Sequence, residues 1–182
     1  MTDTIAIIAA HDGKTIHPST WELYAFAKKL NPNAVICFFL VGENTRQLAE
    51  DISSRAGCTA MAADVPNTRN YHGEIHKNAL AHLLTSHPNA YILASHSTSG
   101  MDYAPALSIR LNAACITGVE DIKMENDRRF FVRAMFNGKL QADIYRQEVS
   151  TSSPLIVTLQ PGAFKPLQPN EKQSPTVIHG SF

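Results

Sequence analysis

The sequence has no apolar run long enough to cross a bilayer. Its longest run, residues 34–41, falls far short of the roughly 20 residues that a membrane helix needs. It also has no excess of either charge, because 16 basic residues balance 16 acidic ones. A balanced chain has no general attraction for nucleic acid or for an anionic membrane surface. We therefore predict no nucleic acid partner and no membrane insertion.

Cysteine is scarce as well. Cys37, Cys58 and Cys115 are scattered, and no two have Cys-x-x-Cys spacing. An odd, scattered set does not make a disulfide framework and is typical of a reducing compartment. The first residues, Met-Thr-Asp-Thr, lack the basic region and apolar core of a secretory signal. These features predict a cytoplasmic protein.

Two common nucleotide motifs are missing. The first apolar run is followed by Ala-Ala-His-Asp-Gly at residues 9–13, where a dinucleotide-binding protein would have Gly-x-Gly-x-x-Gly. There is no Walker loop anywhere in the chain. The sequence therefore argues against a Rossmann dehydrogenase and against a P-loop nucleotidase.

The first 112 residues alternate between apolar runs and amphipathic segments. Val, Ile and Phe are concentrated in the apolar runs, and Ser19 with Glu22 matches a capping box ahead of the first amphipathic segment. Four strand–helix repeats predict a mainly parallel sheet covered on both faces, which is a three-layer α/β sandwich. The predicted strands are residues 4–10, 34–41, 59–63 and 91–94, and the predicted helices are residues 19–30, 45–56, 70–86 and 106–112.

The last third of the chain has a different pattern. Strand-like runs follow one another without helices between them, and Asn137-Gly138 is a strong hairpin signal. We predict a short antiparallel or mixed extension of the sheet, built from residues 115–117, 119–123, 129–136, 141–146 and 155–158. Prolines recur after residue 164, which predicts one domain over residues 1–164 and a Pro-rich tail or linker over residues 165–182.

The loop after the fourth predicted strand is the candidate binding site. In an open parallel sheet, ligands bind beyond the carboxyl ends of the strands. The hydroxyls and amides of four residues there precede a helix whose N-terminus favours an anion, and they are the candidates for holding a nucleotide or a phosphate. They are Ser97, Thr98, Ser99 and Gly100. Asp102 opposes an anion, so we favour the other interpretation, which is a plain turn whose hydroxyls cap a helix with Pro105 in its first turn.

Other polar residues give weaker signals. His72 and His76 stand four apart and can share a metal, but no third ligand is evident, so we favour two solvent-facing histidines. His11, Asp12 and His96 are the residues that a small hydrolase or transferase would use, and this ranks last among the hypotheses. No catalytic residue and no metal ligand is assigned, and the chain is predicted not to be an enzyme.

Four stretches together resemble one family, in order and at matching spacing over about residues 4–164. The sequence resembles the N-terminal domain of the alpha subunit of electron transfer flavoprotein. The stretch at 95–105 departs from the family pattern at Ser95 and Met101, where the pattern has glycine and arginine. The four stretches are Ala10-His11-Asp12-Gly13-Lys14, the Gly-x-Asp-x-x-Pro motif within Ser95 to Pro105, the hairpin Arg133 to Gly138, and the segment Thr158 to Phe164, which contains the Pro-Gly-Ala-Phe motif.

The resemblance implies an adenine nucleotide alpha hydrolase-like fold and an electron-carrier role. It implies FAD for the complete family complex and no cofactor bound by this chain alone, because the family's flavin is held mainly by a C-terminal domain and a beta subunit. The implied partner is a beta-like subunit, and an isolated chain is a candidate for a self-associated dimer. The competing hypothesis is an adenine-nucleotide-binding module that uses the crevice at the carboxyl ends of the strands.

Overall fold

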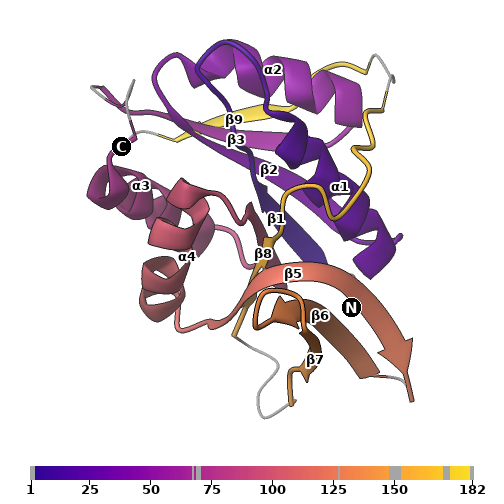
Figure 1. The fold of residues 1–182 in the computed structure, drawn as a ribbon. Coiled ribbons are helices and arrows are strands. Elements are labelled where there is room, and N and C mark those ends of the chain that lie inside the picture. Colours follow the sequence, from indigo (N-terminus) through magenta and orange to yellow (C-terminus); the bar gives the residue numbers. More distant parts are fainter. Residues whose placement is uncertain are drawn as a thin grey trace.

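The computed structural model describes residues 3–66, 68, 71–126, 128–147, 153–169 and 173–180. Within them, nine strands form one sheet in the order β7-β6-β5-β8-β4-β1-β2-β3-β9 (Figure 1). The helices are α1 (Pro18–Leu30), α2 (Thr45–Ala56), α3 (Gly73–Thr85) and α4 (Thr98–Arg110). The strands are β1 (Thr4–Ile8), β2 (Val35–Gly42), β3 (Thr59–Asp64), β4 (Tyr91–Ser95), β5 (Ala114–Glu125), β6 (Arg128–Met135), β7 (Leu140–Tyr145), β8 (Leu155–Leu159) and β9 (Val177–Gly180).

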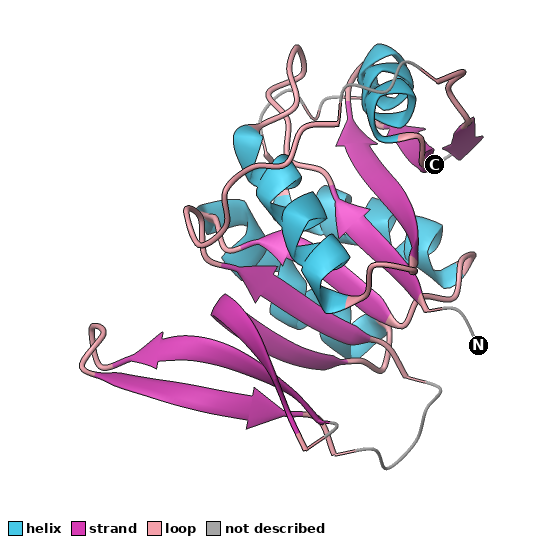
Figure 2. Cartoon of the chain, turned by 90° about the vertical axis from the view of Figure 1, so that its right-hand side faces the viewer, coloured by secondary structure: helices cyan, strands magenta, loops and turns pink. Residues whose placement is uncertain are grey.

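The helices cover the two faces of the sheet, as Figure 2 shows. Alternate residues of β1 point to opposite faces, so Ile5 and Ile7 pack under α1 and α2 while Ala6 and Ile8 pack under α3 and α4. The parallel strands β1, β2, β3, β4 and β8 are mostly buried on both faces, which is why their sequences are largely apolar rather than alternating. The predicted three-layer sandwich is confirmed. None of the described helices is long and apolar enough to span a bilayer.

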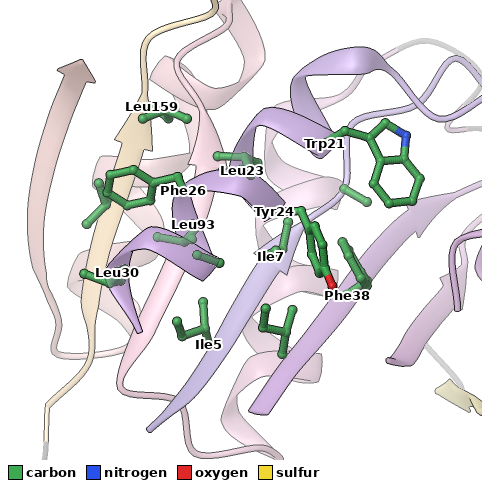
Figure 3. Packing of buried hydrophobic residues seen from close by; sticks show 14 of the residues in the cluster. Ile5, Ile7, Trp21, Leu23, Tyr24, Phe26, Leu30, Phe38, Leu93 and Leu159 are labelled. Atoms are coloured by element: carbon green, nitrogen blue, oxygen red, sulfur yellow. The ribbon is translucent and has the colours of Figure 1, made fainter. Parts of the chain in front are cut away.

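Aromatic side chains of α1 make the centre of the larger core cluster (Figure 3). Trp21 meets Phe38 of β2 edge-on at 6.2 Å between ring centroids, and Tyr24 stacks on the same ring at 5.9 Å. Phe26 lies edge-on to Phe164 at 5.3 Å. These contacts fix α1 both to the sheet and to the loop that follows β8.

The antiparallel part of the extension is confirmed for β5, β6 and β7, with two differences. Residues 155–158 belong to β8, which lies inside the sheet and pairs in parallel with both β4 and β5. Residues 115–117 and 119–123 belong to a single strand, β5, which pairs in parallel with β8 at its start and antiparallel with β6 at its end. The register shifts between these two halves, where Gly118 has a φ of +66° that other residues rarely adopt. The hairpin turn at Asn137-Gly138 is also confirmed, since both residues have positive φ.

The capping box predicted at Ser19 is wrong. Helix α1 begins at Pro18, and the His17 ring accepts the Ser19 amide. Proline suits the first helical position because its missing N–H would have no partner there. Glu22 is instead buried, and its carboxylate accepts a hydrogen bond from the Gly162 amide at 2.7 Å. A side chain read as a local cap therefore fixes a distant turn.

The Pro-rich segment after residue 164 contributes to the sheet. Strand β9 pairs in parallel with β3, and Ala60 N donates to Thr176 O at 2.9 Å. The Gln173 amide also donates to Ser54 O of α2. The division of the chain at residue 164 stays a prediction, but composition did not predict this edge strand.

Candidate functional site

A crevice of about 450 Å³ lies where the order of the strands reverses. From β1 the chain runs outward to β2 and β3, and then returns to place β4 on the other side of β1. The loops after β1, β2 and β4 diverge at this point, which is where ligands bind in open α/β sheets. The described residues that line the crevice include His11, Lys14, Gly42, Asn44, Ser97 and Ser99.

Only two of the four predicted binding residues line this crevice. Ser97 and Ser99 line it. Thr98, the first residue of α4, is exposed, and Gly100 is a buried residue of the same helix. The Ser97 hydroxyl accepts the Gly100 amide at 3.2 Å, and Ser97 O accepts the Met101 amide at 2.8 Å. The amides of Gly100 and Met101 are thus already hydrogen-bonded within the chain and are not free to bind an anion.

Helix α4 begins eight residues earlier than predicted. It starts at Thr98, so Pro105 lies inside the helix and not in its first turn. The Ser97 cap supplies the start signal, and the Ser108 hydroxyl donates to Pro105 O at 2.7 Å. The sequence interpretation failed because a proline was taken to mark the helix start.

Every described helix N-terminus on this edge has a side chain of the chain itself beside it. Asp64 of β3 accepts hydrogen bonds from the Thr45 amide at 2.6 Å and the Thr45 hydroxyl at 2.7 Å, so a carboxylate occupies the start of α2. The Asp102 carboxylate abuts Gly73, the first residue of α3. His17 and Ser97 cap α1 and α4. A phosphate would have to displace one of these groups to reach a helix dipole.

His11 lies against the floor of the crevice as a neutral side chain. Its Nε2–H donates to Val41 O at 3.2 Å, and its Nδ1 accepts the Gly13 amide at 3.2 Å. Burial lowers the pKa of His11, and this outweighs the hydrogen bond to Val41 that would raise it. Protonation would also remove the acceptor that Gly13 uses. The ring sits so close to Gly42 that a Cβ there would lie 2.8 Å from His11 Cε1.

The remaining charged groups give the crevice no cationic cradle. The Asp12 carboxylate accepts the Thr15 amide at 2.7 Å and the Lys14 amide at 2.8 Å, and these bonds lower the pKa of Asp12. Among the described lining residues, Asp12 and Glu43 oppose the single cation Lys14. The described part of the crevice is thus slightly anionic while His11 is neutral.

The family follows from comparison with known proteins. The sequence model of the electron transfer flavoprotein domain matches residues 5–180. The chain belongs to the electron transfer flavoprotein family. This confirms the resemblance drawn from the Gly-x-Asp-x-x-Pro and Pro-Gly-Ala-Phe stretches.

The relatives of this electron transfer flavoprotein domain are alpha subunits. Those of Bacillus subtilis and Methylophilus methylotrophus are each 20% identical to it, over 155 and 166 residues, which is 85% and 90% of this chain. That of Clostridium acetobutylicum is 25% identical over 134 residues, or 72% of this chain. The matches cover 46%, 50% and 39% of the relatives, so the chain spans half their length or less. Proteins of this family are electron carriers rather than enzymes in the usual sense.

Of the histidines singled out from the sequence, His11 and His76 line the crevice, whereas His72 and His96 are not among its described lining residues. No group of three potential ligands occurs among the described residues. His76 Nδ1 lies 3.0 Å from His72 O, and its ring contacts Tyr71. His96 contacts the Thr158 hydroxyl at 2.9 Å, and burial, followed by the Arg133 charge, lowers its pKa.

The three thiols of the domain are partly buried, and no disulfide joins them to one another. Burial raises the pKa of Cys37 to about 12 and also raises that of Cys115. At neutral pH Cys37 is therefore a thiol rather than a nucleophilic thiolate.

Sequence reasoning missed Asp64 and Tyr71, and judged Asp102 only as a charge that opposes an anion. The Tyr71 hydroxyl donates to the Asp102 carboxylate at 2.7 Å and so links the start of α3 to α4. Burial, and then this bond to Asp102, raises the pKa of Tyr71. Asp64 stands 19 residues after the helix start that it caps, so no local spacing rule would have found it.

The neutral state of His11 predicts a pH dependence of stability. The unfolded chain takes up a proton on His11 near pH 6.5 while the folded domain does not, so the free energy of unfolding should fall as the pH drops from 7 to 5. One such group contributes at most about 1.4 kcal/mol per pH unit. Urea unfolding should show that the free energy of unfolding depends less steeply on pH in His11→Gln than in the wild type.

The matched control for this measurement is His72→Gln, which removes an exposed histidine at the same edge of the sheet. It should keep the wild-type dependence. An equal pH dependence in wild type and His11→Gln would show that His11 is not held neutral.

Proposed function

We propose that this chain is a structural, partner-binding domain of an electron transfer flavoprotein alpha subunit. Its contribution to FAD-dependent electron transfer would arise only in a complete complex with a beta-like subunit. The observation that carries the proposal is the family match across residues 5–180, combined with relatives that extend to about twice this length. A cytoplasmic location and self-association of the isolated chain remain predictions.

The described part of the crevice does not fit FAD as the family's cofactor. A diphosphate needs free amides or cations, and here Ser97, Asp64 and Asp102 occupy three helix N-termini. The described lining adds two carboxylates and one lysine. We therefore assign no flavin contact and no electron-transfer step to the described residues, and we propose that this domain acts by packing.

The test is co-purification with a candidate beta subunit, followed by measurement of bound flavin. We expect this chain alone to retain no stoichiometric FAD. We expect a complex with the beta subunit, with flavin retained when the remainder of an alpha subunit is supplied. Stoichiometric FAD on this chain alone would contradict the proposal, and so would the absence of any complex.

The second candidate is an adenine-nucleotide-binding module. Its support is the position of the 450 Å³ crevice at the reversal of strand order, together with the hydroxyls of Ser97 and Ser99 in its lining. A ligand that binds only the folded state raises its melting temperature. A thermal shift with AMP or ATP would favour this candidate over a purely structural role.

A further inference from the structure

A second hollow, of about 740 Å³, lies at the opposite edge of the sheet. It is bounded by the amino ends of β1, β4 and β8 and by the ends of β5, β6 and β7 that meet them. In Figure 1 the amino end of β1 lies near the N-terminal label, far from α2. The proposed function assigns no role to it.

The composition of the hollow is that of a protein interface. Arginine, tyrosine and methionine are enriched where proteins meet, while lysine and acidic residues are depleted. These three residue types supply six of the thirteen described residues that line the hollow. The six are Tyr91, Met124, Arg128, Arg129, Tyr145 and Arg146.

The described lining is positively charged. The lining includes Arg128, Arg129 and Arg146. Asp3 is the one acidic residue among the described lining residues, and Arg129 lies 3.6 Å from its carboxylate while also donating to the Tyr91 hydroxyl at 2.8 Å. Arg128 is exposed and lies over the Tyr145 ring at 5.4 Å from its centroid. No ion pair of Arg128 occurs among the described residues. Arg128 therefore gives the described lining an exposed positive charge that no described carboxylate pairs with.

Apolar side chains at the rim point to a macromolecule rather than a small enclosed ligand. Met124 is 64% exposed and Tyr145 is 44% exposed. Small-molecule sites bury most of their ligand inside concave apolar walls, whereas exposed rims of this kind become buried when two proteins associate. Nucleic acid is disfavoured, because it needs a basic groove that tracks several phosphates.

We propose that this hollow docks an acidic segment of the beta-like subunit, with Arg128 as its charged anchor and Tyr145 and Met124 as the apolar contacts. The proposal rests on the proposed function, which supplies the partner. A planar guanidinium held against an aromatic ring is already oriented to receive a carboxylate, so less side-chain freedom is lost on binding.

The test measures the dissociation constant of the complex with a candidate beta subunit at 50 and 300 mM NaCl. We expect Arg128→Glu to weaken the complex at least tenfold at low salt and to flatten its salt dependence. Arg128→Lys should keep the salt dependence, because the charge remains, but should lose part of the affinity, because lysine has no planar guanidinium to stack on Tyr145. Arg46→Glu makes the same charge change on α2, at a side chain that is 73% exposed, and should stay within twofold of wild type. Circular dichroism and the melting temperature verify that each variant is folded.

The outcomes separate the two proposals. Absence of any wild-type complex overturns the proposed function and this inference with it. A complex that Arg128→Glu weakens no more than Arg46→Glu overturns this inference alone. Binding of a fluorescent single-stranded oligonucleotide that Arg128→Glu abolishes would assign the hollow to nucleic acid and would also overturn it.

Discussion

Replacing Gly100 by alanine should lower the free energy of unfolding by about 3 kcal/mol, a penalty at the upper end of the usual range for overpacking. A Cβ at Gly100 would lie much closer than 3.0 Å to Ser95 O, which is nearer than real Cβ atoms approach another atom. It would also lie 3.1 Å from the Ser95 carbonyl carbon. Both are backbone atoms of β4, so no side chain can move to make room. Helix α4 would have to shift away from the sheet that it covers.

Urea unfolding followed by circular dichroism measures this effect, and the melting temperature should fall by about 9 °C in a domain of this size. In an unhindered helix the same change gains up to about 1 kcal/mol, so a loss identifies the clash. Gly73→Ala is the matched control. Its Cβ would meet the Asp102 carboxylate, the end of a side chain that can rotate, so it should cost much less. An equal loss of unfolding free energy in the two variants would show that close packing of α4 against β4 is not the reason why position 100 is glycine.

Truncation of Phe26 to alanine should cost about 4 kcal/mol, as is usual for a large aromatic side chain in a core. Phe26 is fully buried, and its ring contacts Phe131 of β6 at 6.5 Å and Phe164 at 5.3 Å between centroids. It therefore joins α1, the antiparallel extension and the Pro-Gly-Ala-Phe loop. Loss of the ring leaves a cavity among three separate segments.

Chemical denaturation also tests this prediction. Phe26→Leu should cost roughly 1 kcal/mol and remain folded, which keeps the prediction measurable if the alanine variant does not fold. Phe136→Ala removes the same atoms from a side chain that is 71% exposed, and it should change stability by less than about 0.5 kcal/mol. Similar costs at positions 26 and 136 would contradict the core assignment of Phe26.

Much of the fold could be predicted because its signals are local. The apolar run before Gly42 and the amphipathic segment at residues 45–56 correspond to β2 and to α2. The hairpin at Asn137-Gly138 follows from two residues that tolerate positive φ. Each depends on neighbours within a few positions, so the sequence pattern contains the whole signal.

The site was predicted less completely. The sequence placed Ser97 and Ser99 at the correct edge of the sheet, where both line the crevice. It predicted that a hydroxyl of this loop caps the helix, but not that Ser97 is the residue that does so through the Gly100 amide, or that Asp64 occupies the start of α2. Ser97 capping is a local interaction that several nearby hydroxyls could have made. The Asp64 contact depends on how β3 lies beside β2.

The sequence by itself determined the family, the strand–helix alternation and the zero net charge, because these are properties of contiguous residues and their order. Only the tertiary structure decided that Glu22 binds Gly162, that β9 joins β3, and that Arg128 lies over Tyr145 beside an open hollow. Segments up to 140 positions apart meet in these contacts. Which partners meet depends on the packing of the whole sheet, and no local pattern of residues contains that information.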